Sequence, residues 1–228
     1  MKTIRLILNT LYHSYKVRQA MNKHGETAFY KQSREWSKDI LKISGIEYKV
    51  FGLENIEKDK SYIFASNHAS LMDIPVIIAA IPTDCNIMYK KELEKVPYWG
   101  KALIQSPYIS VDRKNPVKAK QSLNESVERL DKGQSLIIFP EGTRSETSKV
   151  CEFKRGAFSV ASVSKKPIIP VALKGTSGLM EKGSKKVSSG SVEVHFLNPV
   201  EISSSNKKEM LDFIDDMRNN ISEIVTSY

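Results

Sequence analysis

Two short, almost purely apolar runs constrain the fold of this chain more than any other feature. Ser135–Phe139 (SLIIF) and Ile168–Leu173 (IIPVAL) contain no charged residue. A strand with one face in water alternates apolar and polar residues instead. Runs of this kind are typical of strands in a parallel sheet that helices cover on both faces. They therefore predict an α/β fold with a largely parallel central sheet flanked by helices.

The rest of the chain from Ile46 onward alternates between strand-like and helix-like patterns. We expect further strands at 46–51, 62–66, 86–89, 108–111 and 191–197. Helical patterns lie at 71–81, 116–132, 155–165 and 207–226. The Gly-, Ser- and Lys-rich segment 174–190 is expected to form a loop. With 228 residues, the chain is long enough for one sizeable core.

Two amphipathic helical patterns precede this part of the chain. The first lies within residues 3–22, and His24-Gly25 separates it from a second one that carries Phe29, Trp36, Ile40 and Ile43. Residues 1–25 contain five basic and no acidic side chains, a large part of the net charge of +9. The pattern fits a membrane-binding helix pair on anionic lipid, or a hairpin packed on the core with a solvated basic face. We divide the chain into this amphipathic pair, residues 1–43, and an α/β domain, residues 44–228.

The cysteines and the hydropathy limit the class of protein. Cys85 and Cys151 lie in no CxxC or Cys/His cluster, so no zinc site is expected. Without a recognisable signal peptide, two isolated thiols indicate a reducing cytoplasm. The longest apolar run, Ile74–Ile81, is less than half of the ~20 residues that a transmembrane helix needs. The chain is therefore expected to lie on a membrane or in solution without crossing a bilayer.

The first candidate site is Asn67-His68 with Asp73, directly after the strand-like run YIFAS. A carboxylate that fixes the tautomer of an imidazole allows the histidine to act as a general base. At this spacing the two side chains meet only if His68 lies in the turn before a helix and Asp73 lies near its start. The alternative is that Ser70 or Asp73 caps the helix and His68 is an ordinary loop residue.

Two further clusters of polar residues also follow strand-like runs, where α/β sheets bind ligands. In FPEGTRS, residues 139–145, the backbone amides of Gly142-Thr143 and the guanidinium of Arg144 suit an anionic group. The same segment also reads as a turn leaving a strand. Asp112-Arg113 and Lys90-Lys91 each offer a phosphate ligand or a surface ion pair.

Taken in order, these clusters resemble the glycerolipid acyltransferase family, and within it the bacterial 1-acylglycerol-3-phosphate acyltransferases. The resemblance covers residues 62–200 and rests on four motifs: Asn67-His68 with Asp73, Lys90-Lys91-Glu92-Leu93 with Pro97 and Gly100 leading to Asp112-Arg113, FPEGTRS, and Pro167-Ile168-Ile169-Pro170-Val171. FKRGAF, residues 153–158, adds a weaker fifth. Family members often carry glycine where this chain has Ser106-Pro107, which affects the expected shape of the acyl-chain region.

The resemblance implies an activity. A fatty-acyl group would move from the thioester of acyl-carrier protein (acyl-ACP) or coenzyme A (acyl-CoA) to the sn-2 hydroxyl of lysophosphatidic acid, giving phosphatidic acid. His68, held by Asp73, would be the general base. The substrate-binding residues that the resemblance implies are Asn67, Lys90, Arg113, Glu141, Gly142, Thr143 and Arg144. No metal or organic cofactor is implied, because the thioester already carries the activation. The helix pair would hold the protein, peripheral or monotopic, on the anionic cytoplasmic face of the membrane.

Other classes of function account for fewer of these features. No GxSxG nucleophile elbow of a serine hydrolase occurs in the sequence. Nucleic-acid binding would explain the charge but not His68, Asp73 or FPEGTRS, and the charge lies on helices with an apolar stripe. Two alternatives remain: a non-enzymatic lipid-binding protein, and a related acyltransferase that uses glycerol 3-phosphate or another lysophospholipid.

Overall fold

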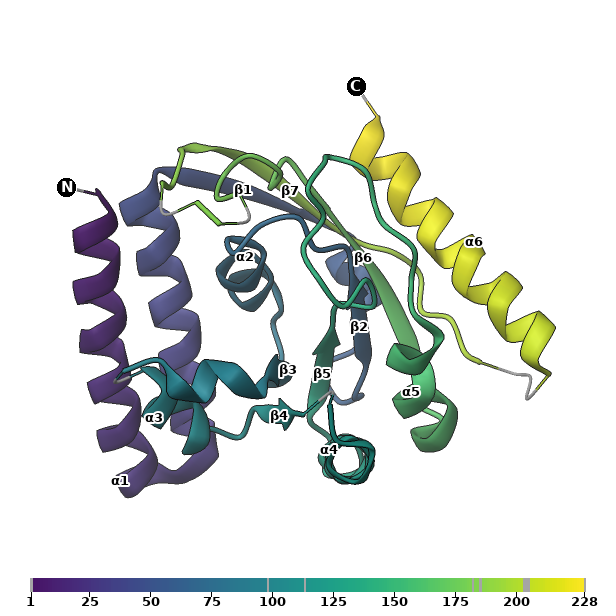
Figure 1. Cartoon of the computed structure of the whole chain (residues 1–228), viewed down its shortest axis with the longest axis horizontal. Helices are drawn as coiled ribbons and strands as arrows, with labels where there is room; N and C mark the ends of the chain where they lie inside the picture. Colours follow the sequence, from purple (N-terminus) through teal and green to yellow (C-terminus); the bar gives the residue numbers. More distant parts are fainter. Residues whose placement is uncertain are drawn as a thin grey trace.

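The computed structural model describes residues 2–97, 99–112, 114–181, 183–184, 186–202 and 206–227, without the side chain of Trp99. Helices surround one seven-stranded sheet (Figure 1). The strands are β1 (Ile46–Phe51), β2 (Ile63–Ser66), β3 (Cys85–Lys90), β4 (Ile109–Val111), β5 (Ser135–Ile138), β6 (Ile168–Lys174) and β7 (Gly190–Phe196). The α-helices are α1 (Lys2–Ser44), α2 (Asp73–Ala80), α3 (Trp99–Ile104), α4 (Pro116–Asp131), α5 (Ser159–Ser164) and α6 (Lys207–Thr226), with short 3-10 turns η1 (Leu53–Asn55), η2 (Lys91–Lys95) and η3 (Arg155–Phe158).

The sheet is parallel at every pairing except one. Its strand order is β1-β7-β6-β2-β5-β3-β4, and only β6 and β7 run antiparallel. This arrangement confirms the predicted α/β fold with a largely parallel sheet. Each strand predicted from the sequence is present within a residue or two of its expected bounds.

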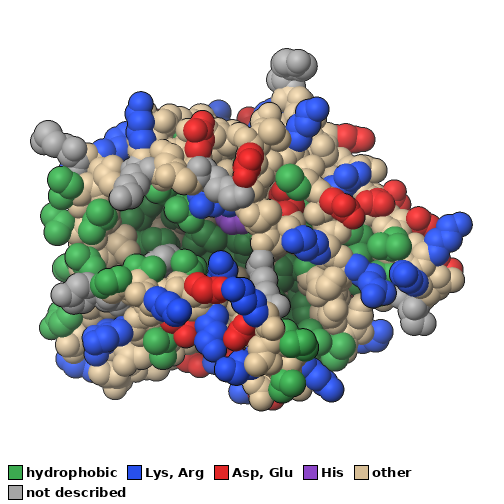
Figure 2. Space-filling view, viewed as in Figure 1, with side chains coloured by type: hydrophobic (Ala, Val, Ile, Leu, Met, Phe, Trp, Pro, Cys, Tyr) green, Lys and Arg blue, Asp and Glu red, His purple; other side chains and the backbone are tan. Residues whose placement is uncertain are grey.

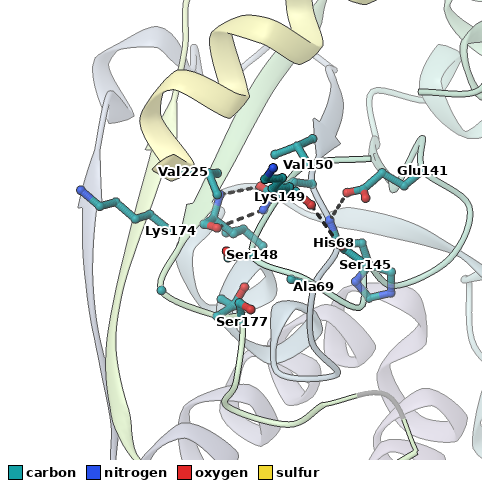
Figure 3. Close-up of a pocket in the computed structure, with 14 residues that line it drawn as sticks. His68, Ala69, Glu141, Ser145, Ser148, Lys149, Val150, Lys174, Ser177 and Val225 are labelled. Carbon is teal, nitrogen blue, oxygen red and sulfur yellow. Dashed lines mark hydrogen bonds between the residues drawn. The ribbon is translucent and has the colours of Figure 1, made fainter. Parts of the chain in front are cut away.

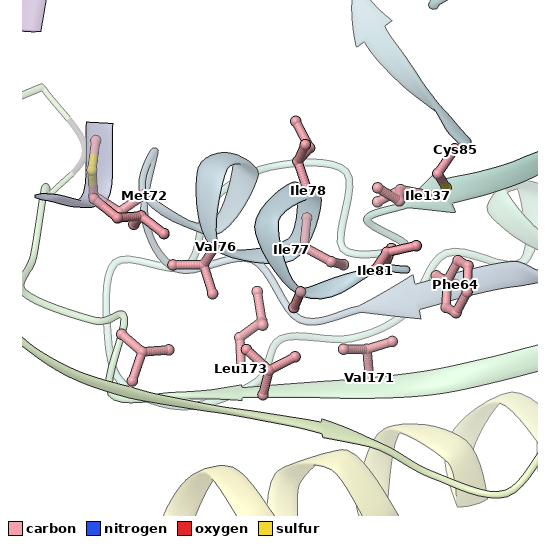
Figure 4. Close-up of a cluster of buried hydrophobic side chains, with 14 of the residues drawn as sticks. Phe64, Met72, Val76, Ile77, Ile78, Ile81, Cys85, Ile137, Val171 and Leu173 are labelled. Carbon is pink, nitrogen blue, oxygen red and sulfur yellow. The ribbon is translucent and has the colours of Figure 1, made fainter. Parts of the chain in front are cut away.

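The apolar central strands are covered on both faces, as their composition predicts. Every residue of β2 and β5 is buried. Along β5, Ile137 belongs to a core cluster with α1 and α2, whereas Leu136 and Ile138 belong to a cluster with α4, α5 and α6. Figure 4 shows the first cluster, where Val76 of α2 faces Leu173 of β6. The sheet is thus the middle of three layers. α2 packs on one face of it, in the cluster that contains Ile137 and Leu173.

α1 is a hairpin of two helices. Gly25 (φ 68°, ψ −159°) breaks the helical backbone where the sequence predicts a break, and its left-handed φ favours glycine. The two halves run antiparallel: Lys2 Nζ donates to Ser44 O (2.9 Å) and Trp36 Nε1 donates to Thr10 Oγ1 (3.2 Å). The second half is joined to α4, since Arg129 Nη1 donates to Glu26 Oε1 (2.6 Å).

Three regions differ from the sequence-based expectation. The helix expected at 155–165 begins as the 3-10 turn η3 and is α-helical only over Ser159–Ser164. α3 was not predicted, because a helix of fewer than two turns carries too little periodic signal. α2 begins at Asp73 rather than at residue 71, because residues 70–72 form a turn in which Ser70 Oγ accepts from Met72 N (3.2 Å). The expected loop at 174–190 contains no helix or strand among its described residues 175–189. None of the helices in the described ranges is long and apolar enough to cross a membrane.

Candidate active site

The predicted site residues gather at one edge of the sheet because the strands that precede them are parallel. β2 and β5 are neighbours, with Ala65 opposite Ile138. Asn67-His68 therefore leaves the sheet beside Phe139 and the segment that follows it. β3 lies next in the sheet, so Lys90 at its end faces the same edge.

His68 and Asp73 are in direct contact. His68 lies in the segment between β2 and α2, and Asp73 is the first residue of α2, the arrangement that their spacing requires. His68 Nδ1 lies 2.7 Å from Asp73 Oδ2, and the same oxygen accepts from the backbone N–H groups of Ala69 and Ser70 (both 2.8 Å). An ionised carboxylate only accepts hydrogen bonds, so in a neutral imidazole beside it Nδ1 carries the proton and Nε2 keeps its lone pair. Within the described part of the chain, Nε2 has no hydrogen-bond partner.

Neither Ser70 nor Asp73 caps α2 through its side chain. Met72 occupies the N-cap position, and no side chain caps it. Ser70 Oγ instead donates to Met180 O (3.2 Å) and accepts from Met180 N (3.1 Å). Ser70 thereby joins the start of α2 to the 175–189 loop, which leaves the Asp73 carboxylate to hold the imidazole.

Glu141 holds the backbone of His68 rather than pointing into open space. Its side chain is buried, Oε1 accepts from His68 N (2.6 Å) and Oε2 accepts from Cys151 N (3.0 Å). Burial raises the pKa of the Glu141 carboxyl above its ordinary value, although the two backbone hydrogen bonds oppose the rise. Both oxygens are thus occupied by backbone donors, so this carboxylate determines where the His68 segment lies.

Two more contacts fix the His68 segment. The side chain of Asn67 is buried; its Nδ2 donates to Leu173 O (3.0 Å) and its Oδ1 accepts from Leu173 N (2.8 Å). The ring of Phe139 stacks on the His68 ring, with centroids 4.2 Å apart and planes inclined by 27°. The imidazole therefore has little freedom to rotate, and Nε2 keeps one direction.

The FPEGTRS segment makes a tight turn beside His68. Gly142 N donates to Phe139 O (3.0 Å), and Gly142 has φ 71°, in the left-handed region that favours glycine. Thr143 is exposed and Arg144 is half-buried. Arg144 Nη1 is buried and makes no hydrogen bond with any described residue. A buried donor without a partner costs about 1–3 kcal/mol, so this guanidinium is suited to accept an anionic ligand.

Of the remaining two candidate residues, Lys90 and Arg113, the structure describes only Lys90. Lys90, the last residue of β3, is exposed, and its Nζ lies 3.7 Å from Glu92 Oε1. A surface ion pair of this kind contributes little, so Lys90 remains available to a ligand. Arg113 lies outside the described residues, and its predicted role stays a prediction.

A cleft of about 910 Å³ opens in front of His68. Figure 2 shows this hollow, which is lined mainly by hydrophobic side chains and has a histidine at its inner edge. Its walls come from α1, α2, α3, α4 and η3, and its inner edge is formed by His68, Phe139 and residues 142–144. Ser106, at the end of α3, also lines it.

A second, more polar cavity of about 360 Å³ lies behind the His68 segment. Ser145 N donates to His68 O (2.7 Å) at its wall. Figure 3 shows the His68 ring turned away from Lys149 and Ser177, which line this cavity. The ring therefore belongs to the larger cleft. Within the described ranges, no three His, Cys, Asp or Glu side chains gather as a metal-binding group.

The sequence is similar to a known protein family and to several of its members. The sequence profile of the Acyltransferase family matches residues 47–174. The 1-acyl-sn-glycerol-3-phosphate acyltransferase of Saccharomyces cerevisiae is 35% identical over 177 residues, 76% of this chain and 58% of that protein. The enzyme of the same name from Limnanthes douglasii is 36% identical over 71% of this chain and 57% of the relative. The one from Bacillus subtilis (strain 168) is 33% identical over 69% of this chain and 79% of the relative.

A solved structure is similar along the whole chain. The crystal structure of the 1-acyl-sn-glycerophosphate (LPA) acyltransferase PlsC from Thermotoga maritima superposes with a TM-score of 0.76 at 26% identity. The superposition covers 100% of this chain and 99% of that one. By contrast, this chain spans less than two thirds of the yeast and Limnanthes relatives.

Proposed function

This chain belongs to the acyltransferase family, and we propose that it transfers a fatty-acyl group from a thioester to the sn-2 hydroxyl of lysophosphatidic acid. One observation carries the proposal: the free Nε2 of His68 faces an apolar cleft while the buried Asp73 carboxylate holds Nδ1. The names of the relatives and of the similar structure support the choice of acceptor.

His68 is the general base in this proposal. Its Nε2 takes the proton of the acceptor hydroxyl as the oxygen attacks the thioester carbonyl carbon. The resulting tetrahedral intermediate collapses, the carbon–sulfur bond breaks, and the imidazolium returns the proton to the departing thiolate. Asp73 stabilises the imidazolium between these two steps. The acyl group passes directly between substrates, so the reaction requires neither a covalent acyl-enzyme nor a metal or organic cofactor.

The phosphate of the acceptor binds next to His68. Only a few bonds separate this phosphate from the reacting hydroxyl, so its cationic ligands belong near the imidazole. Arg144 supplies a buried guanidinium nitrogen without a partner, and the Gly142-Thr143 backbone lies beside it. Lys90 and Arg113 complete the proposed set of cationic ligands. Asn67 and Glu141 position the His68 segment through the contacts described above.

The hydrophobic walls of the cleft accommodate fatty-acyl chains. Leu71, in the turn before α2, and Ile74 and Ile78 of α2 line it together with Phe29 and Trp36 of α1. Burial of methylene groups against such side chains contributes about 0.8 kcal/mol each. The Ser106 side chain, at the position of the departure from the family pattern, donates to Leu103 O (2.6 Å) and ends α3 at the edge of this space.

The first helix of α1 provides the proposed contact with an anionic membrane surface on the cytoplasmic side. Its outward face carries large apolar residues that are 55–64% exposed: Ile4, Ile7, Leu8, Tyr12 and Tyr15. The basic side chains of the same helix add attraction to anionic lipid. Replacing Ile4 and Leu8 together by serine should lower the partition coefficient onto anionic vesicles by roughly 10²-fold. Leu211→Ser, a change at an exposed leucine of α6, is the matched control, and equal pelleting of all variants would contradict the proposal.

An assay of acceptor and donor together tests the function. The purified protein would receive lysophosphatidic acid, glycerol 3-phosphate or lysophosphatidylcholine in mixed micelles, each with acyl-ACP and with acyl-CoA. We expect phosphatidic acid from lysophosphatidic acid, and none with His68→Ala. If the protein acylates another acceptor instead, the proposed acyl transfer stands and the proposed acceptor is wrong. No turnover with any acceptor, together with intact vesicle binding, would favour a non-enzymatic lipid-binding protein.

A further inference from the structure

The cleft in front of His68 extends in two directions. We call the part between α1, α2 and α3 the hairpin arm; its walls include Val17, Phe29, Trp36, Ile74, Ala102 and Leu103. We call the part between α4 and the η3–α5 segment the lysine arm; its walls include Ala119, Lys120, Leu123, Lys154, Gly156, Ala157 and Val160. Figure 1 shows the first helix of α1 at one end of the molecule and α5 well away from it. His68 and Phe139, which also line the cleft, belong to neither arm.

The charge of the cleft is one-sided. Among the described residues that line it, four are lysine or arginine and none is aspartate or glutamate. Lys90 and Arg144 belong to the proposed acceptor site. Lys120 and Lys154 remain, one on each wall of the lysine arm, and neither forms an ion pair with a described residue. No described acidic side chain pairs with these two charges, which favours an anionic group beside them.

The floor of the lysine arm is apolar. Ala119 and Leu123 come from α4, and Gly156, Ala157 and Val160 come from η3 and α5. Small side chains at three of these positions leave room for a thin, partly apolar chain rather than for a ring system. Lys154 is fixed at the rim through its backbone, because its N–H donates to Pro140 O (2.9 Å) in the FPEGTRS segment.

We propose that the lysine arm binds the 4′-phosphopantetheine group of the thioester donor, with Lys120 and Lys154 contacting its phosphate. This inference rests on the proposed function. The phosphate of the acceptor lies close to its reacting hydroxyl and needs cations beside His68. The phosphate of the donor lies at the far end of the long pantetheine chain and needs cations farther along the cleft. The dimethyl and methylene groups of pantetheine fit the apolar floor, and the same group is present in acyl-CoA and acyl-ACP.

A binding experiment tests this site without turnover. Calorimetry would compare 4′-phosphopantetheine with pantetheine, which lacks only the phosphate. We expect the parent protein to bind the phosphorylated compound more tightly, by about fivefold for each lysine contact, and the Lys120→Ala/Lys154→Ala variant to bind both compounds alike. Lys208→Ala, at an exposed lysine in the first turn of α6, should keep the full preference. A preference unchanged in the double variant would overturn the proposal.

Steady-state kinetics then compare the two possible donors, acyl-CoA and acyl-ACP. Each single variant should raise KM for the thioester about fivefold, and the double variant about 25-fold if the contacts add. KM for lysophosphatidic acid should not change, and Lys120→Arg and Lys154→Arg should retain most of the affinity. Equal effects with acyl-CoA and acyl-ACP support the shared phosphopantetheine phosphate. A rise in KM for only one of the two donors, or a rise in KM for lysophosphatidic acid instead, would overturn the proposed phosphopantetheine site.

The two experiments also distinguish this inference from the function on which it rests. If the parent protein transfers no acyl group but binds 4′-phosphopantetheine through the two lysines, the proposed reaction fails and the site stands. If it forms phosphatidic acid but shows no lysine-dependent binding, the reaction stands and the site fails.

Discussion

Two histidines line the same cleft, each paired with an aspartate, and the two pairs differ in what surrounds them. In one, His68 Nδ1 meets the fully buried Asp73 carboxylate and Nε2 has no partner among the described residues. In the other, His13 Nε2 meets Asp39 Oδ2 (2.9 Å), and Nδ1 accepts from Gln32 Nε2 (2.6 Å). The side chain of Asp39 is 50% exposed, whereas that of Asp73 is 0% exposed.

A hydrogen bond to an aspartate is therefore not enough to make a histidine a general base. A general base needs a free nitrogen that faces the substrate, and it needs a partner that fixes its tautomer. His68 has both, while both nitrogens of His13 are used to join the two helices of α1. The spacing of a histidine and an aspartate in the sequence does not show whether the other ring nitrogen is free. The groups around that nitrogen come from segments far away in the sequence.

The largest expected effect is that of His68→Ala. Loss of a positioned base should lower kcat/KM by about 10²–10⁴-fold, measured as the initial rate of phosphatidic acid formation. Thermal unfolding by circular dichroism is the control, because the imidazole is at the cleft and its loss leaves the core intact. A variant that keeps a rate close to the parent's would place the base elsewhere.

Asp73→Asn should come next. The amide can present a donor to Nδ1, so the proton can move to Nε2 and the ring no longer offers its lone pair to the substrate. We expect kcat to fall by about 10²-fold with little change in either KM. If KM rose instead while kcat held, Asp73 would serve binding and not the tautomer of His68.

His13→Ala should act mainly on stability. It removes one of the two acceptors of the buried Gln32 amide and leaves Glu35 Oε2 (3.3 Å) as the other. The lost hydrogen bond costs about 1–3 kcal/mol of unfolding free energy, measured in urea. Turnover should fall far less than in His68→Ala. A loss of turnover as large as that of His68→Ala, at unchanged stability, would erase the distinction between the two pairs.

Asp39→Asn should have the smallest effect. Because this carboxylate is half exposed, its contact with His13 is screened by water, and the expected change in unfolding free energy is below about 1 kcal/mol. The acyl-transfer rate should be that of the parent. Asp39→Asn and Asp73→Asn are the same chemical change, made at an exposed and at a buried partner of a histidine. The difference between their effects therefore measures the role of burial.

Much of the fold was predictable because it depends on patterns along the chain. The apolar runs of β5 and β6 indicate a sheet covered on both faces, and His24-Gly25 indicates the turn of α1. The spacing of His68 and Asp73 also defines the local geometry that the structure has. Parallel strands then bring the motifs to one edge without further information.

The rest depends on contacts between segments far apart in the sequence. Glu141 reads as part of a turn, and nothing in its neighbours indicates that both oxygens accept from the backbone of His68 and Cys151. That contact exists because β2 and β5 are adjacent. The lysine arm has the same origin, since Lys120 and Lys154 line one cleft only after α4 and the segment around η3 have packed in the fold.

The pairing of β1 with β7 has a consequence for how the protein is made. Each residue of β1 has its partner in β7, with Ile46 opposite Gly190 and Phe51 opposite His195. During synthesis the amphipathic α1 and β1 therefore leave the ribosome long before the strand that β1 needs, and such distant pairings form late. Throughout that interval the apolar stripes of α1 lack most of their final cover. A lipid surface or a chaperone that receives them early would thus act on the nascent chain before the sheet can close.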